Sequence, residues 1–303
     1  MITTHIHPDG DSIASVLLFA SLLKHLGKRY VILLDDDVPY KFDFLPGVEE
    51  IKHYRKFPNN FIPQVLVVLD SSDIERIGSV GRVISDEIVV LNVDHHPSNR
   101  AFGDVNAIDS EESSTAEIVH ALLTLCQVPV SPEIATLVYT GIVCDTGRFL
   151  FPNTNLRSLH VCTQMIGYGA LPSWIAQKLY CRSSKTTIRA LASALSTLEF
   201  HFNGTVSCIH LSNGILASNN EVDTEGFVDY LLAIEDTEVE FFMCEKEPCV
   251  FRVSFRSKER VDVNAVAQAL GGGGHTRASG CTMEGTVDDV KNKILHVLKD
   301  YVG

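Results

Sequence analysis

Three short runs of apolar, largely β-branched residues constrain the fold of this chain most, and each of them ends on an aspartate. The runs cover residues 30–35, 65–70 and 88–94. Runs of this length are typical of strands buried on both faces of a parallel sheet, although a buried helix can show the same pattern. Because helical patterns alternate with them, beginning with the apolar stretch over 11–26, the sequence predicts an α/β domain with a doubly wound, mainly parallel sheet.

The second half of the chain has a different pattern. From about residue 113 it is helical, and Ser114 and Glu117 have the spacing of a capping box. Further helices are predicted over 132–145, 155–168, 172–180 and 188–198. Strand patterns at 205–211, 239–243 and 249–256 then mix with helical patterns at 226–234, 263–270 and 287–302, as in a smaller α+β domain. We therefore expect a catalytic domain over 1–182, a linker helix over 183–198 and a C-terminal domain over 199–303.

Charge and composition narrow the classes of function. The chain has 25 Lys and Arg against 38 Asp and Glu, a formal net charge of −13, and it has no basic stripe. This argues against a protein that holds long nucleic acid by neutralising phosphates. No run approaches about 18 apolar residues, so we expect no membrane span and no membrane partner. Eight singly scattered cysteines and the lack of an apolar signal segment predict reduced thiols and a cytoplasmic location.

The segment from His5 to Asp11 says most about the possible chemistry of the protein, because it contains several candidate ligand residues. It lies where the first strand should end and the first helix begin, and Asp9 and Asp11 flank a glycine that permits a tight turn. Both carboxylates can then converge beyond the carboxyl end of the strand, where open α/β sheets place their ligands. Taken alone, the same residues also fit an ordinary turn with a helix cap.

Further acidic and histidine residues close the later apolar runs. They are Asp70, Asp94, His95 and His96. Carboxylates gathered at one sheet edge repel one another unless they are protonated, separated or bound to cations. Mixed carboxylate and imidazole donors suit Mn²⁺, with Mg²⁺, Fe²⁺ or Co²⁺ as possible occupants, and the absence of thiolates argues against structural zinc. Asp145, at the end of an apolar helix, either caps it or joins this cluster, whereas the run 35–37 is expected to be a solvated loop.

These blocks, in this order and spacing, resemble the motifs of the DHH phosphoesterase superfamily over nearly the whole chain. The resemblance implies two Mn²⁺ ions, with His5 and Asp9 on the first, Asp11, His95 and Asp145 on the second, and Asp70 bridging both. It also implies that His96 contacts the substrate phosphate or leaving group and that Asp94 supports the histidines.

A second motif lies near the C-terminus, where four glycines, 271–274, precede His275. Such a run can form a nest of backbone N–H groups for an anion, or simply a flexible turn. The motif resembles the Gly-Gly-Gly-His motif of the DHH-associated C-terminal domain in the nanoRNase branch. That resemblance implies that substrate is bound by Gly272, Gly273, Gly274, His275 and the strand-end Arg256. We also expect Arg277 to contact the substrate. Arg256 also fits a surface ion pair.

The resemblance implies a hydrolase of phosphoric esters with its active site in the interdomain cleft. We expect an Mn-dependent phosphodiesterase that cuts short RNA oligonucleotides and linear dinucleotides such as pApA to 5′-mononucleotides by two-metal water activation. By analogy with the family, we also expect the protein to form a homodimer. Alternatives are a 3′-phosphatase on adenosine 3′,5′-bisphosphate (pAp), a cyclic di-AMP phosphodiesterase, an inorganic pyrophosphatase and, from a non-enzymatic class, a nucleotide-binding module.

Overall fold

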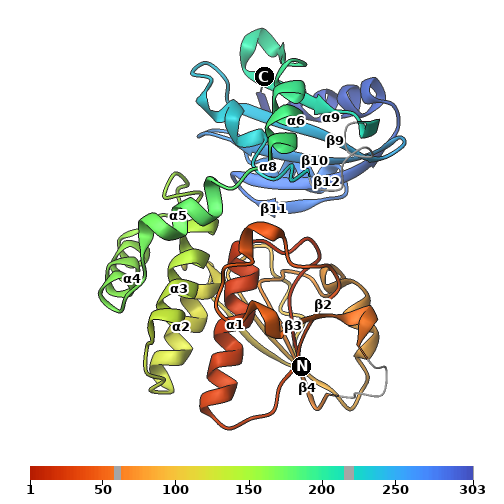
Figure 1. The fold of residues 1–303 in the computed structure, drawn as a ribbon. Coiled ribbons are helices and arrows are strands. Elements are labelled where there is room, and N and C mark those ends of the chain that lie inside the picture. The colour runs from red at the N-terminus through yellow and green to blue at the C-terminus, as the bar shows by residue number, and fades with distance from the viewer. Residues whose placement is uncertain (58–62, 215–221, 303) are drawn as a thin grey trace. The chain divides into compact units, whose positions relative to one another are not determined.

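The computed structural model describes residues 1–57, 63–214 and 222–302 (Figure 1). The chain divides into two compact units, Met1–Arg182 and Ser183–Gly303. Each unit contains its own six-stranded sheet and its own hydrophobic core. Within the described ranges, every helix is too short or too polar to cross a lipid bilayer.

The first unit is built on an all-parallel sheet with the strand order β3-β2-β1-β4-β5-β6. Its strands are β1 (Ile2–Thr3), β2 (Ile32–Leu34), β3 (Ile51–His53), β4 (Val65–Leu69), β5 (Val89–Asp94) and β6 (Val105–Ile108). The three apolar runs became β2, β4 and β5, which confirms the predicted parallel α/β fold. The chain direction across the sheet reverses between β1 and β4, and this switch point is where such sheets bind ligands.

One face of this sheet is covered by α1 (Gly10–His25) and α2 (Thr115–Leu125). The helix α3 (Pro132–Asp145) packs on both of them, and α4 (Leu156–Gly167) and α5 (Pro172–Tyr180) pack on α3. Each of the first four begins at a side-chain cap, such as Ser131 before the proline that opens α3, because a hydroxyl, carboxylate or amide oxygen accepts an otherwise unpaired N–H. The other face is covered by 3₁₀ turns over Ile74–Val83, with Ile77 and Val80 fully buried.

The second unit has a mixed sheet with the order β11-β12-β10-β9-β8-β7. Its strands are β7 (Glu199–His201), β8 (Val206–Leu211), β9 (Val239–Glu247), β10 (Val250–Ser257), β11 (Gly273–His275) and β12 (Ala278–Glu284). Only β8 and β9 pair in parallel, and the other neighbours are antiparallel. One face packs on α8 (Val263–Ala269) and α9 (Val287–Val302), and the other on α6 (Lys185–Leu195) and a 3₁₀ turn over Val228–Ala233.

Two features of this unit differ from the sequence expectations. The helix expected as a linker, α6, packs Ala190, Leu191 and Ala194 into the core of the second unit and is an integral part of it. The glycine run, expected as an anion-binding nest or a flexible turn, continues into the edge strand β11, where Gly273 and Gly274 pair with β12. A Cβ atom on Gly272 would lie 2.1 Å from the carbonyl oxygen of Gly280, so glycine is required there for close strand approach.

Candidate active site

The residues singled out in the first unit lie beyond the carboxyl ends of β1, β4 and β5, next to the switch point of the sheet. His5 follows β1, Asp70 follows β4, and β5 ends on Asp94 immediately before His95. Since β1 pairs with β4, and β4 with β5, three adjacent strands deliver these side chains to one edge. The parallel sheet therefore explains why residues far apart in sequence meet.

Asp9 both caps a helix and faces His5. The segment can therefore form a helix cap and contribute a ligand at the same time, the two roles that the sequence left open. One carboxylate oxygen of Asp9 accepts the N–H of Ser12 at 3.0 Å, closing a capping box at the start of α1. The other oxygen lies 4.0 Å from Nε2 of His5. The His5 ring is oriented by a 2.8 Å contact between its Nδ1 and the carbonyl oxygen of Ile6.

Asp11 is buried at the N-terminus of α2. Its two oxygens accept the backbone N–H groups of Thr115, at 2.7 Å, and of Ala116, at 2.9 Å. Burial raises the pKa of Asp11 well above its usual value, and the charges of Asp70 and Asp145 raise it further. The helix N–H groups act in the opposite direction, because they stabilise the charged form.

Asp70 is the centre of the cluster and is held in a left-handed backbone conformation, with φ 55°. Its Oδ2 lies 3.6 Å from His5 Nε2, and its Oδ1 lies 3.8 Å from His95 Nε2 and 3.7 Å from His96 Nδ1. Thr115 donates its hydroxyl to Oδ1 at 2.9 Å. Burial opposes ionisation, but the hydrogen bond from His5 and the charges of the three histidines outweigh it and keep the pKa of Asp70 below its usual value.

His95 joins Asp70 to Asp145. Its Nδ1 lies 3.2 Å from the carbonyl oxygen of Glu112, and its Nε2 lies 3.3 Å from Oδ2 of Asp145. Asp145, the last residue of α3, also accepts a 3.2 Å hydrogen bond from Asn153. Burial raises the pKa of Asp145 to about 7, although His95 lowers it. A backbone partner on one ring nitrogen is the usual way in which a protein aims the other nitrogen of a metal-binding histidine.

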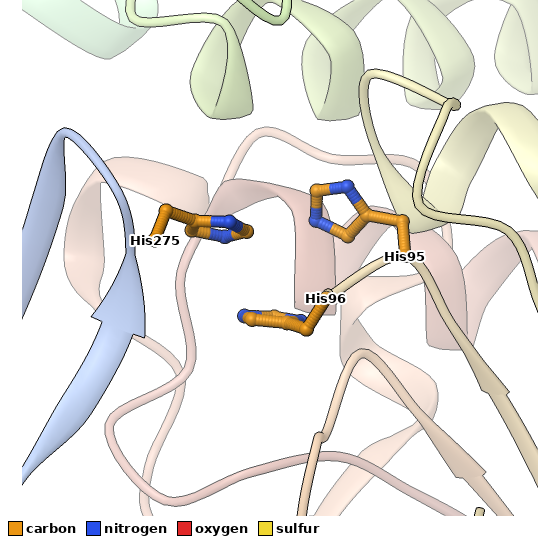
Figure 2. A group of neighbouring side chains, drawn as sticks. All are labelled: His95, His96 and His275. Atoms are coloured by element: carbon orange, nitrogen blue, oxygen red, sulfur yellow. The ribbon is translucent and has the colours of Figure 1, made fainter. Parts of the chain in front are cut away.

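His96 belongs to a buried hydrogen-bond chain that ends on asparagines. Its Nδ1 lies 2.7 Å from Asp94 Oδ1, and the other oxygen of Asp94 accepts a 2.5 Å hydrogen bond from the amide of Asn99. The Asn99 amide also bonds Asn92 Oδ1 at 2.8 Å. Figure 2 shows the neighbouring rings of His95 and His96, whose centroids are 5.0 Å apart at an interplanar angle of 65°.

Asn99 is expected to matter for activity although it was not predicted from the sequence. Replacing Asn99 with alanine removes the amide that fixes Asp94, and through it His96, so we expect a loss of about 10- to 100-fold in kcat. The measurement is steady-state hydrolysis of pApA, and the control is Asn106→Ala, which removes an exposed amide that bonds the backbone of Gly103. Equal activities of the two variants would contradict a positioning role for Asn99.

The cluster as a whole offers three sets of ligand atoms, each set lying within 4.8 Å. The sets are His5, Asp9 and Asp70; Asp11, Asp70 and His95; and Asp70, Asp94 and His96. Asp70 is common to all three, and Asp145 approaches the second set through His95. Buried carboxylates that raise one another's pKa form a site whose charge a divalent cation offsets, so the donor chemistry fits metal ions with oxygen and nitrogen ligands.

The second unit places two of its expected binding residues in one row of the sheet. Arg256 of β10 and His275 of β11 both pair with Ala278 of β12. Side chains directly opposite one another on neighbouring strands share a face, so the arginine and histidine flank a small residue at a spacing of about 10 Å. Arg256 also makes the ion pair left open as an alternative, with its Nε 2.8 Å from Asp229 Oδ1.

Arg277 has different surroundings. Its guanidinium donates to the carbonyl oxygen of Val261 at 2.8 Å and to that of Glu259, and it lies 3.4 Å from the Ser257 hydroxyl. These contacts hold the turn between β10 and α8 together. They favour a structural role for Arg277 over the substrate contact expected from the sequence.

The residues that sequence reasoning missed are partners of the cluster through space. They are Asn92, Asn99, Thr115 and Asn153. Asn99 lies three residues after the Asp-His-His triplet, and Thr115 opens a helix whose first N–H groups donate to a carboxylate. Those are weak signals, because asparagine and threonine are common in turns and at helix starts.

An open parallel sheet with buried histidines and aspartates at its switch point, joined to a second unit with a glycine-rich edge, defines a class of metal-dependent phosphoesterases. The DHH family N-terminal domain matches residues 1–142, and the DHHA1 domain matches residues 203–303. The chain therefore belongs to the DHH family, a family of metal-dependent phosphoesterases, and it is a hydrolase of phosphoric esters.

Several relatives of known name point to one branch of this family. The chain is 36% identical to the bifunctional oligoribonuclease and PAP phosphatase NrnA of Thermus thermophilus, over 99% of this chain and 89% of the relative. It is 26% identical to the NrnA of Bacillus subtilis, over 92% and 87%. An exopolyphosphatase-related protein from Bacteroides fragilis superposes with a TM-score of 0.88 at 25% identity, over 99% of this chain and 92% of that chain. These similarities place the chain with the nanoRNase and pAp-phosphatase branch and support nucleotide phosphoesterase activity.

Proposed function

We propose that this protein is an Mn²⁺-dependent phosphodiesterase that hydrolyses short RNA oligonucleotides and linear dinucleotides such as pApA to 5′-mononucleotides. The observation that carries the proposal is the meeting of three ligand sets on Asp70 in a chain similar to NrnA proteins along its whole length. The formal charge of −13 agrees with short substrates, because they need few phosphate contacts whereas a long strand requires a basic track.

The proposed ligands divide into two groups joined by one carboxylate. His5 and Asp9 would hold the first ion; Asp11, His95 and Asp145 would hold the second; and Asp70 would contact both. When bound, a pair of dications lowers the pKa of water and offsets charge on a phosphoryl group. The 3.6–3.8 Å distances from Asp70 to His5 and His95 support a shared ligand at this position.

His96 and Asp94 are proposed to act on the substrate side of the reaction. Asp94 lies 2.7 Å from Nδ1 of His96 and orients the imidazole, whose Nε2 would donate a hydrogen bond to a phosphate or leaving-group oxygen. Asn99 fixes the far oxygen of Asp94, so the imidazole is oriented before the substrate binds. Stabilising negative charge on the departing oxygen is the role we assign to this pair.

The second unit, Ser183–Gly303, is proposed to be the substrate-binding domain, and it includes the helix over 183–198 that the sequence assigned to a linker. Arg256, His275 and the glycines 272–274 would hold a phosphate and nucleotide of the substrate. Their support is the shared face of Arg256 and His275 across Ala278, and the close approach that glycine permits between β11 and β12. Arg277 would act indirectly by fixing the turn that follows Arg256.

A second activity, removal of the 3′-phosphate of pAp, is proposed for the same residues. Relatives at 36% and 26% identity are named as bifunctional oligoribonucleases and PAP phosphatases. Both reactions cleave a phosphoric ester next to a ribose, so one cluster of metal ligands can serve both. Cyclic di-AMP differs because it has no terminal phosphate.

The test is a substrate panel assayed with Mn²⁺, containing pApA, RNA ladders, pAp, cyclic di-AMP and pyrophosphate. We expect AMP from pApA, progressive shortening of short RNA, adenosine monophosphate and phosphate from pAp, and little turnover of the other two. Pyrophosphate as the preferred substrate would replace the proposal with an inorganic pyrophosphatase. Binding of pApA without hydrolysis in the presence of metal would make the protein a nucleotide-binding module.

Removal of metal gives a separate prediction. Dialysis against a chelator is expected to reduce pApA hydrolysis by at least about 100-fold, because the buried carboxylates then repel one another instead of holding ions. Activity should return most fully with Mn²⁺, and less with Mg²⁺, when each is added back in a titration. Full activity after verified removal of all metal would contradict the proposed chemistry.

We also propose a cytoplasmic homodimer. The scattered single cysteines suit a reducing compartment. Several apolar side chains of α4 and α5 are exposed, among them Leu156 at 86% and Trp174 at 40%, and such a surface is suited to burial against a second copy. Light scattering of the purified chain distinguishes a dimer from a monomer.

A further inference from the structure

The edge of the second sheet gathers three side chains that the proposed phosphoesterase reaction does not use. Glu199 and His201 lie two residues apart on β7, so they point to the same face of the strand. Cys208 of β8 is the direct cross-strand partner of Glu199. Strand alternation and register therefore bring a carboxylate, an imidazole and a thiol together on one face.

Two distances within this trio match edges of a tetrahedron around a metal ion. Cys208 Sγ lies 3.6 Å from His201 Nε2, and His201 Nε2 lies 3.5 Å from Glu199 Oε2. A tetrahedral zinc ion with usual bond lengths holds a sulfur and a nitrogen ligand about 3.5 Å apart, and a nitrogen and an oxygen ligand about 3.3 Å apart. All three donor atoms lie within 4.8 Å of one another.

The surroundings also suit a metal site open to solvent on one side. The side chains of Glu199 and His201 are 41% and 23% exposed, which gives an ion and a fourth, water ligand a path to the site. Cys208 is buried beneath them at 2% exposure. Lys291 of α9 lies 3.0 and 3.1 Å from the two oxygens of Glu199, as a donor that orients a metal-binding carboxylate does.

We propose that Glu199, His201 and Cys208 form a binding site for a thiophilic divalent cation such as Zn²⁺ in the second unit. The site differs in kind from the aspartate and histidine cluster of the first unit, because it contains a thiolate ligand. Binding deprotonates the thiol: the sulfur–hydrogen bond breaks, the proton leaves to solvent, and the sulfur lone pair forms the metal bond. Because the thiol gives up its proton on binding, metal uptake should release a proton and strengthen as pH rises.

Cobalt substitution tests this proposal on the full chain, because Co²⁺ bound by a thiolate absorbs in the near ultraviolet by charge transfer from sulfur. Oxygen and nitrogen ligands give no such band, so the cluster in the first unit cannot produce it. We expect a thiolate–cobalt band whose amplitude at saturating Co²⁺ corresponds to one thiolate-bound ion per chain, and that is displaced by Zn²⁺. Absence of the band at saturating Co²⁺ would overturn the proposal.

Two thiol variants identify the cysteine. Cys208→Ser should abolish the band, whereas Cys281→Ser, which removes another buried thiol of the same core, should keep it. Loss of the band in both variants, or its retention in Cys208→Ser, would reject the site. Because Cys208→Ser alters a buried position, His201→Gln at the partly exposed imidazole gives an independent measurement. It should weaken Zn²⁺ affinity at least tenfold, and an unchanged affinity would also reject the site.

Discussion

Replacing Asp70 with asparagine is expected to lower kcat for pApA by at least about a thousandfold while the protein remains folded. Asp70 lies within 3.6–3.8 Å of His5, His95 and His96, and all three ligand sets of the first unit include it. Asparagine has nearly the same volume and can still accept the hydroxyl hydrogen bond of Thr115. What asparagine lacks is the negative charge. A thousandfold loss of kcat, which raises the activation barrier by about 4 kcal/mol, would therefore come from the missing charge and not from a change in side-chain shape.

The measurement is the rate of AMP release at saturating Mn²⁺, together with the metal content of each purified protein. Asp73→Asn serves as the matched control, because Asp73 lies three residues further on, caps a 3₁₀ turn and pairs with exposed Arg100. Asparagine caps as well as aspartate, so this variant should retain nearly full activity. If Asp70→Asn kept more than about a tenth of the wild-type rate with its metal in place, Asp70 would not bridge two ions.

Parts of the fold were predictable because local signals and tertiary structure agree. The helix predicted over 132–145 has those bounds in α3, since Pro132 sets its first turn and Ser131 caps it. The apolar runs became β2, β4 and β5 because strands buried on both faces have few polar residues. Strands β3 and β6 were not predicted, because edge strands carry polar residues and form only when a neighbouring strand pairs with them.

Contacts over long sequence distances account for most of what the sequence did not reveal. Asp35 was expected in a solvated loop, but it accepts hydrogen bonds from the backbone N–H and the hydroxyl of Ser79. Asp11 shows the same principle within the cluster, since its partners Thr115 and Ala116 lie more than a hundred residues away. Motif spacing identified the candidate site residues in the sequence. Their hydrogen-bond partners could not be identified in this way, because they depend on how α1 and α2 pack.

Gly141 is where this packing is most sensitive to substitution. It lies in α3, and a Cβ atom there would stand 2.4 Å from Ala116 Cβ and 2.8 Å from Asp11 Oδ1. Real Cβ atoms do not approach this closely, and Ala116 Cβ is fixed to the backbone of α2, so the two helices would have to separate. Gly141→Ala should therefore destabilise the protein by about 3 kcal/mol, despite the better helix propensity of alanine.

The same substitution should also reduce activity. When α2 moves to make room for the new methyl group, the N–H of Ala116 moves with it and no longer holds the carboxylate of Asp11 in place. Equilibrium urea unfolding measures the first effect as a lower midpoint, and pApA hydrolysis measures the second as a loss of about 100-fold. Gly167→Ala, at the exposed end of α4 with no atom within 4 Å of the new methyl group, is the matched control. Since it gains helix propensity without a clash, it should be neutral or stabilising by up to about 1 kcal/mol. Equal unfolding midpoints for the two variants would show that α2 and α3 can move apart without cost, and that Asp11 is not held by their contact.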